Sequence, residues 1–183
     1  HDFTTSGTRE VTLTVTDVNG NVSTCNATVS VIDAINPTIT CSPNIGVNND
    51  QGICGAMVSY SISANDNCSG FTIAQTAGLP SGSTFPVGVT TNTFVVTDSS
   101  GNTATCSFNV TVTDNEPPSF INVPVSFSAC NPISWVEPTP VDNCPGVTMT
   151  SNYPPGTTFP PGTTTITYTA TDAYSHQYSV SFD

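Results

Sequence analysis

The chain has 183 residues, and its 13 Asp and Glu residues stand against a single arginine, Arg9, which gives a formal net charge of −12. Nucleic acids and anionic membranes attract proteins through basic patches, so we expect no nucleic-acid partner and no membrane insertion. Charged residues make up 8% of the chain, where about 25% is usual. Thr, Ser, Asn, Val, Gly and Pro take their place, a composition typical of short strands and many turns.

The chain begins with two alternating apolar and polar segments around a turn, within residues 8–33, and the same pattern returns in residues 84–114 and 158–183. Period-2 alternation predicts half-buried strands, and each pair of segments predicts a β-hairpin. Five positions of the first copy lie 81 residues before their counterparts in the second: Asp17, Gly20, Asn21, Cys25 and Asp33 precede Asp98, Gly101, Asn102, Cys106 and Asp114. A period of this length is one small domain, so the chain is a tandem array.

The repeats divide the chain into three predicted segments. Residues 1–33 are the C-terminal part of one repeat, 34–114 a complete repeat, and 115–183 a repeat truncated at its C-terminal end. Short proline-containing linkers separate them. We therefore expect a piece of a longer protein whose adjacent domains follow one another closely.

Within the complete repeat, strands are predicted at 37–43, 56–61 and 71–75, followed by the hairpin of 91–97 and 104–113. Turn residues recur every 8–12 residues, which favours an antiparallel sandwich of the immunoglobulin or fibronectin kind. The predicted fold class is all-β: tandem immunoglobulin-like antiparallel β-sandwich domains. In the last repeat we expect a strand at 133–136 that carries the only tryptophan, Trp135.

The seven cysteines occur without a CxxC motif, which indicates disulfides and an oxidising, extracellular setting. The last repeat has Asn122 and Val180 where the complete repeat has Cys41 and Cys106. Two cysteines that are absent together are most simply partners, so we predict a Cys41–Cys106 disulfide.

The remaining cysteines of the two repeats share a spacing. Fourteen residues separate the members of each pair, so the predicted disulfides are Cys54–Cys68 and Cys130–Cys144. Cys25 matches Cys106, and its expected partner precedes His1. Zinc is the competing interpretation, but the spacing does not fit and neither histidine lies near a cysteine pair.

Acidic and amide residues recur where an immunoglobulin-like sandwich brings the entering linker, a loop and the last hairpin turn to one end. For the complete repeat that end collects Asp33, Asp66, Asn67 and Asp98, and for the last repeat Asp114, Glu116, Asp142, Asn143 and Asp172. Converging oxygen ligands suit Ca²⁺. The alternative is that these residues only begin turns and cap loops. The cofactor prediction is therefore either none or Ca²⁺.

No catalytic residue is predicted. His1 and His176 lie near the chain start and in a hairpin turn, and neither accompanies a Ser or Cys nucleophile in a repeated context. Trp135 and Tyr60 could stack on sugars, but aromatic residues on alternating strands belong more often to the core.

Several ordered motifs resemble the hyalin repeat (HYR) domain family of immunoglobulin-like extracellular modules. They are PTITCSP, SYSISANDNC and SWVEPTPVDNC, GSTFPVG and GTTFPPG, and TDSSGNTATCSFNVTV. Their four-cysteine form looks like that of bacterial surface arrays. The last repeat departs from the pattern at Asn122, Val180 and the Ser175-His176 pair. The resemblance implies roles in adhesion and as structural repeats, with no catalytic residues.

From these observations we expect a non-catalytic structural or adhesive module, extracellular or on the cell surface, within a stalk, adhesin or filament. Its expected partners are neighbouring repeats of the same protein, including self-assembly through sheet edges or a donated strand. The alternative is a carbohydrate-binding or spacer module of a secreted enzyme.

Overall fold

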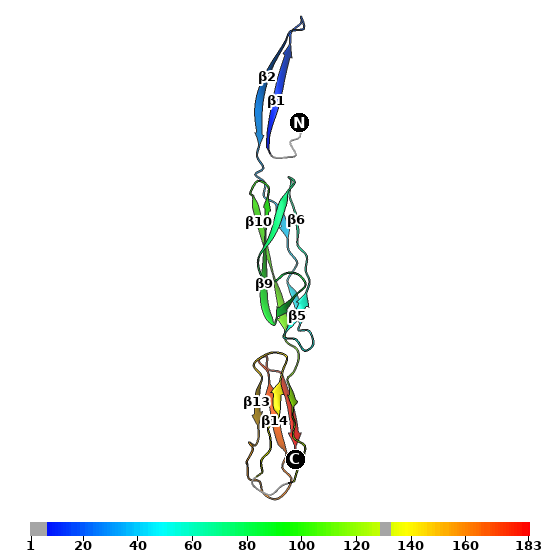
Figure 1. Ribbon diagram of the computed structural model, residues 1–183, viewed down its shortest axis with the longest axis vertical. Coiled ribbons are helices and arrows are strands. Elements are labelled where there is room, and N and C mark those ends of the chain that lie inside the picture. Colours follow the sequence, from blue (N-terminus) through cyan, green and yellow to red (C-terminus); the bar gives the residue numbers. More distant parts are fainter. Residues whose placement is uncertain (1–6, 129–132) are drawn as a thin grey trace. The chain divides into compact units, whose positions relative to one another are not determined.

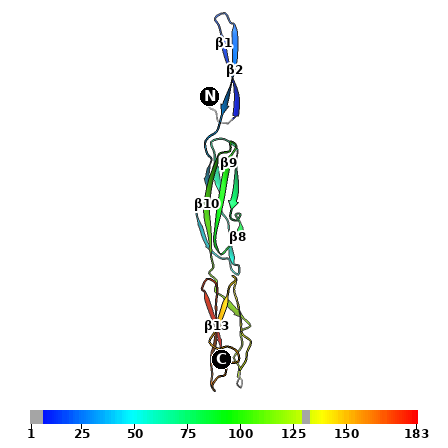
Figure 2. The same cartoon turned by 90° about the vertical axis from the view of Figure 1, so that its left-hand side faces the viewer.

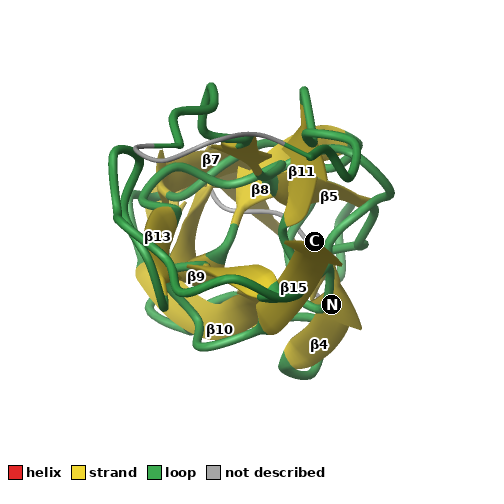
Figure 3. Ribbon diagram, turned by 90° about the horizontal axis from the view of Figure 1, so that it is seen from below, coloured by secondary structure: helices red, strands yellow, loops and turns green. Residues whose placement is uncertain are grey.

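The structure is a computed structural model that describes residues 7–128 and 133–183, and strands joined by turns and loops make up all of this part of the chain (Figure 3). The all-β prediction is confirmed, and no helix of the described residues is long and apolar enough to cross a membrane. The strands are β1 (Gly7–Thr16), β2 (Val22–Val31), β3 (Thr38–Thr40), β4 (Ile45–Asn48), β5 (Gly55–Val58), β6 (Ser63–Asn65), β7 (Phe71–Ala77), β8 (Ser83–Pro86), β9 (Gly88–Asp98), β10 (Thr103–Thr113), β11 (Ser119–Ile121), β12 (Thr139–Val141), β13 (Thr148–Ser151), β14 (Ile166–Thr171) and β15 (Gln177–Phe182).

The chain folds into two compact units that do not coincide with the sequence repeats. The first unit comprises residues 1–44, 60–81 and 91–109, and the second comprises 45–59, 82–90 and 110–183. The two long strands β9 and β10, labelled in Figure 1, each contribute residues to both units.

The first unit contains the hairpin of β1 and β2, paired antiparallel from Gly7 with Val31 to Thr16 with Val22. It also contains most of the hairpin of β9 and β10, which lie side by side (Figure 2). Strand β7 pairs antiparallel with β9, and β3 pairs antiparallel with β6. Aromatic and aliphatic side chains on one face of β9 and β10 form the core, and the ring of Tyr60 packs edge-on against Phe108 at 4.9 Å between centroids.

The second unit contains residues 45–59, 82–90 and 110–114 of the complete repeat, together with residues 115–183. Strand β4 pairs parallel with the end of β10, and β5 pairs antiparallel with β8. In the last repeat, β11 pairs with β12, and β13, β14 and β15 form a three-stranded sheet. Phe159, Ile166, Tyr168 and Phe182 form its buried core.

The strand expected at 133–136 does not form, because residues 133–138 have no ladder partner and the next strand begins at Thr139. Trp135 still packs against the core, and its indole Nε1 donates a hydrogen bond to the Tyr168 hydroxyl at 2.8 Å. Tyr60 likewise donates its hydroxyl hydrogen to the Leu79 carbonyl oxygen at 2.6 Å. Both aromatic residues are therefore core components.

The same type of turn closes each of the three hairpins. Asp17, Asp98 and Asp172 each accept a hydrogen bond at Oδ1 from the backbone N–H four residues later, at 2.8 Å in every case. The side chain of that later residue contacts Oδ2 at 2.7–2.8 Å. The Asp-based turn expected from the sequence thus recurs with the same geometry.

Candidate cation-binding clusters and a disulfide between repeats

The first disulfide joins Cys41, just after β3, to Cys106 in β10, with a Cα–Cα distance of 5.9 Å. This is the pairing expected from their joint absence in the last repeat. The bond spans 65 residues of sequence and lies within the first unit. It ties the beginning of the complete repeat to its final strand.

The second disulfide corrects the prediction for the other cysteines. Cys54 bonds to Cys144, with a Cα–Cα distance of 4.8 Å and a sequence separation of 90 residues. Neither the Cys54–Cys68 nor the Cys130–Cys144 pair forms, because each would need a sulfur that this bond occupies. Cys130 itself lies outside the described residues, and Cys25 is exposed on β2.

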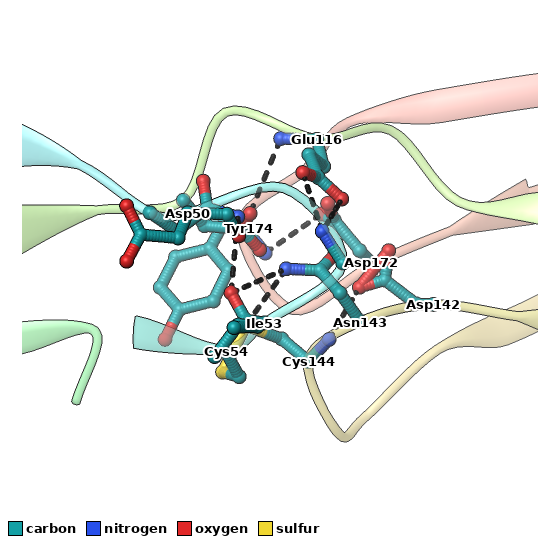
Figure 4. The surroundings of a disulfide bond; sticks show 12 residues. Asp50, Ile53, Cys54, Glu116, Asp142, Asn143, Cys144, Asp172 and Tyr174 are labelled. Carbon is teal, nitrogen blue, oxygen red and sulfur yellow. Dashed lines mark hydrogen bonds between the residues drawn. A yellow bond between two sulfur atoms is a disulfide. The ribbon is translucent and has the colours of Figure 1, made fainter. Parts of the chain in front are cut away.

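Hydrogen bonds around Cys54 explain why it meets Cys144 (Figure 4). Both carboxylate oxygens of Glu116 accept a hydrogen bond from Gly52 N, at 2.9 and 3.1 Å. The Asn143 side-chain amide donates to the Ile53 carbonyl oxygen at 3.3 Å. The loop before Cys54 is therefore held against the residues that flank Cys144, whereas Cys68 belongs to the other unit.

The first carboxylate cluster joins Asp33, Asp66 and Asp98, whose nearest oxygens lie within 4.8 Å of one another. Each residue comes from a different segment: Asp33 from the linker after β2, Asp66 from the loop after β6, and Asp98 from the end of β9. Asp33 accepts hydrogen bonds at Oδ1 from Ile35 N at 3.1 Å and from the Asn67 amide at 3.3 Å. Asp66 accepts one at Oδ2 from Cys68 N at 3.1 Å.

The second carboxylate cluster repeats this arrangement one repeat later. A carboxylate oxygen of Asp114 lies within 4.8 Å of one from Asp142. An oxygen of Asp114 also lies within 4.8 Å of potential ligand atoms of Asp172 and His176. Asp114 accepts a hydrogen bond at Oδ1 from Glu116 N at 3.2 Å, and Asp142 accepts one at Oδ2 from Cys144 N at 2.9 Å. Figure 4 places Asp142, Asn143 and Asp172 close together beside the disulfide.

The structure thus brings six of the seven acidic residues singled out in the sequence into two groups. The exception is Glu116, whose carboxylate binds Gly52 N. Two participants were not identified as candidates: Asn102 and His176, whose side chains contact Asp98 and Asp172 at 2.8 and 2.7 Å. The recurrence of an amide four residues after Asp17 and Asp98 was the signal available for Asn102.

Hydrogen bonds keep three of these carboxyl groups acidic. The Cys68 side chain and Ile35 N lower the pKa of Asp33 below its ordinary value. Burial raises the pKa of Asp98 and of Asp172, but hydrogen bonds from Asn102 and Ser100, and from His176 and Tyr174, outweigh that effect and lower both. These groups carry negative charge at neutral pH.

Comparison with known proteins gives two matches to the HYR domain family model, at residues 32–112 and 113–183. Hyalin of Strongylocentrotus purpuratus is 33% identical over 180 residues, which cover 91% of this chain and 15% of hyalin. The serine-rich adhesin for platelets of Staphylococcus aureus is 33% identical over 121 residues, covering 60% of this chain and 5% of the adhesin. The protocadherin gammaB4 extracellular domain is 18% identical with a TM-score of 0.41, covering 99% of this chain and 38% of that one.

The chain thus spans a small part of the curated relatives that it matches. The two disulfides among the described residues belong to an oxidising compartment, and together with these relatives they make the chain an extracellular or cell-surface protein. The Cys54–Cys144 bond joins a residue of the first family match to one of the second. With both matches covering residues 32–183, the chain belongs to the HYR domain family.

Proposed function

We propose that this chain is a non-catalytic structural and adhesive segment of a longer extracellular array, within a stalk, adhesin or filament. The observation that carries the proposal is the Cys54–Cys144 disulfide, because it connects two consecutive HYR repeats covalently. A disulfide confined to one repeat stabilises that repeat alone. A bond between repeats also holds their junction when the chain is pulled.

Two further contacts reinforce that junction in the second unit. They are the hydrogen bonds of Glu116 with Gly52 and of Asn143 with Ile53, which cross between the two repeats beside the disulfide. The proposed partners are neighbouring repeats of the same protein, and self-assembly into a filament is a proposed extension of this role. The division at residues 33/34 and 114/115 and the bacterial character of the four-cysteine pattern stay predictions.

Calcium is proposed as the cofactor of the array, at the two carboxylate clusters. The alternative of a carbohydrate-binding module gains no support from Tyr60 and Trp135, because both direct their polar atoms to partners within the protein. A catalytic domain elsewhere in the full-length sequence would support a spacer role beside an enzyme.

Single-molecule force spectroscopy on the 183-residue chain tests the mechanical part of this proposal. Extended residues span at most about 3.3–3.6 Å each, and the Cys54–Cys144 bond shelters the 90-residue separation between its cysteines from the pulling force. Reduction with dithiothreitol should therefore lengthen the fully unfolded chain by roughly 300 Å. The Cys25→Ser variant is the control and should match the oxidised parent.

An equal unfolded length before and after reduction would contradict the proposal, since no bond would then bridge the two repeats. A variant with both Cys54→Ser and Cys144→Ser separates the two disulfides. Under oxidising conditions it should unfold to a longer contour than the parent, but a shorter one than the reduced chain, because Cys41–Cys106 still shelters its own loop.

A further inference from the structure

The two carboxylate clusters contain nearly all of the unsatisfied polar atoms in the described part of the chain. Six buried side-chain N or O atoms there have no hydrogen-bond partner, and five of them belong to these clusters. They are Oδ2 of Asp33, Oδ1 of Asp66, Oδ2 of Asp114, Oδ1 of Asp142 and Oδ1 of Asn143. All five are oxygens.

The unsatisfied oxygens belong to side chains that are otherwise firmly held. Asp33 is 8% exposed and Asp114 is 2% exposed, and each uses its Oδ1 to accept a backbone hydrogen bond. Asp66 and Asp142 use Oδ2 in the same way. Each carboxylate is thus oriented by one oxygen and leaves the other without a partner.

A buried oxygen without a hydrogen-bond donor lowers the stability of the fold, and neighbouring negative charges lower it further. The chain has no excess of basic residues to offset it, since Arg9 is the only Lys or Arg. A bound cation satisfies both requirements, because it neutralises charge and accepts oxygen lone pairs.

We propose that each cluster binds one divalent metal ion of the calcium class. The ligands of the first site are Asp33 Oδ2 and Asp66 Oδ1, and those of the second site are Asp114 Oδ2, Asp142 Oδ1 and Asn143 Oδ1. Asp98 and Asp172 supply further negative charge beside the ion. This inference names the ions and atoms of the calcium role proposed above, and it does not depend on adhesion.

The donor set selects the kind of ion. All proposed ligand atoms are carboxylate or amide oxygens, which suit hard cations. The sulfur of Cys144 is near Asp114 and Asp142 but belongs to the disulfide, so it is not a thiolate ligand for zinc or other soft ions. Water molecules complete the six to eight oxygen ligands that Ca²⁺ usually takes.

The sites join segments that are distant in sequence. In the second site Asp114 directly follows β10, whereas Asp142 and Asn143 follow β12. An ion held by all three residues therefore stabilises the start of the last repeat beside the disulfide. The first site does the same for the linker after β2 and the loop after β6.

Isothermal titration of the oxidised 183-residue chain with CaCl₂ tests the proposal, in a buffer with about 0.15 M NaCl to screen diffuse attraction. We expect two ions per chain, with Kd on the order of 10⁻⁴–10⁻³ M as in extracellular calcium modules. Thermal unfolding should shift upward by several degrees between chelator and excess CaCl₂. MgCl₂ should bind more weakly, because Mg²⁺ demands a stricter octahedral geometry.

Three variants assign the ions to the sites. Asp33→Asn and Asp114→Asn should each lower the stoichiometry to one, and the double variant should bind none. Asp17→Asn is the control, because it removes the same charge from a residue that belongs to neither cluster. Both Asp17 oxygens already accept hydrogen bonds, from Asn19 N, Asn21 N and the Asn21 amide, and Asp17 is exposed. It should keep both ions.

Two results would overturn the proposal. One is two-ion binding that persists in the double variant, and the other is an equal loss in Asp17→Asn, which would indicate diffuse charge attraction. Far-UV circular dichroism and an intact disulfide pattern establish that each variant is folded. The titration measures ion binding alone, so a negative result would leave the force experiment and the proposed structural role unaffected. A negative force experiment would likewise leave the proposed ion sites unaffected.

Discussion

The hairpins β1–β2 and β9–β10 have nearly the same turn and the same alternation but very different surroundings. Leu13 and Val15 are 62% and 58% exposed, whereas their counterparts Phe94 and Val96 are 7% and 0% exposed. In the described residues, β1 and β2 form a sheet of two strands, while β9 and β10 belong to a sheet of four. The turn is therefore encoded locally, whereas burial depends on the strands that cover the apolar face.

The largest loss of stability is expected from a substitution on the buried apolar face of β9. Phe94→Ala should lower the free energy of unfolding by about 3–5 kcal/mol, because it removes a buried ring. That ring lies 5.9 Å from the ring of Tyr60 and 6.4 Å from that of Phe108. Leu13→Ala should change the free energy by less than about 0.5 kcal/mol, as exposed substitutions do. Urea unfolding followed by circular dichroism measures both, and equal losses would show that the exposed hairpin face is covered.

A smaller effect is expected at the turn glycine. Gly101 has φ +91°, and a Cβ built there meets no atom within 4 Å, so only the backbone conformation opposes a side chain. Gly101→Ala should therefore cost about 1–2 kcal/mol. Gly46 in β4 has equally open space without a left-handed φ, so Gly46→Ala is the control and should cost nothing. Thermal unfolding distinguishes the two, and a similar loss in both would refute the backbone explanation.

In the third hairpin, a substitution at the same turn position is expected to raise stability instead of lowering it. Ser175 occupies the position of Gly20 and Gly101 and has φ +74°. Ser175→Gly should raise the free energy of unfolding by up to about 1 kcal/mol, because glycine adopts this conformation without strain. Ser100→Gly, one position earlier in the β9–β10 turn, should give no gain. Thermal unfolding of the two variants measures the difference, and a loss in Ser175→Gly would show that the serine stabilises the turn.

The smallest effect on stability is expected at acidic pH, where the turn aspartates become protonated. Hydrogen bonds from Asn21 lower the pKa of Asp17, and those from Asn102 and Ser100 outweigh burial to lower the pKa of Asp98, from an ordinary value of 3.8. A lowered pKa in the folded state stabilises the protein above the unfolded pKa, and this stability is lost as the pH falls through the folded pKa. Carboxyl carbon NMR should place both midpoints below 3.8. Asn102→Ala should raise only the Asp98 midpoint, and an unchanged midpoint would contradict the assigned cause.

The sequence predicts well what one repeat determines by itself. The hairpins follow from alternation and turn residues, and the Cys41–Cys106 pair follows from its joint absence in the last repeat. The convergence of Asp33, Asp66 and Asp98 follows from the order of strands in an immunoglobulin-like sandwich. These features require only local patterns and the comparison of repeats.

The sequence fails where one repeat contacts the next. The shared spacing of Cys54 with Cys68 and of Cys130 with Cys144 indicated pairs inside each repeat, yet Cys54 bonds to Cys144. Equal spacing also results when each cysteine bonds to a neighbouring repeat, so spacing alone does not separate the two patterns. The strand expected at 133–136 fails for another reason. Its alternation reflects the packing of Trp135 on the core, and Pro138 and Pro140 follow closely.

The Cys41–Cys106 and Cys54–Cys144 disulfides also overlap along the chain, because Cys54 lies between Cys41 and Cys106, and Cys106 lies between Cys54 and Cys144. Any single peptide-bond cleavage between residues 41 and 144 therefore leaves at least one bridge connecting the two fragments. Outside the cell, where proteases are common and repair by resynthesis in place is absent, a nicked chain would keep everything beyond the cut attached.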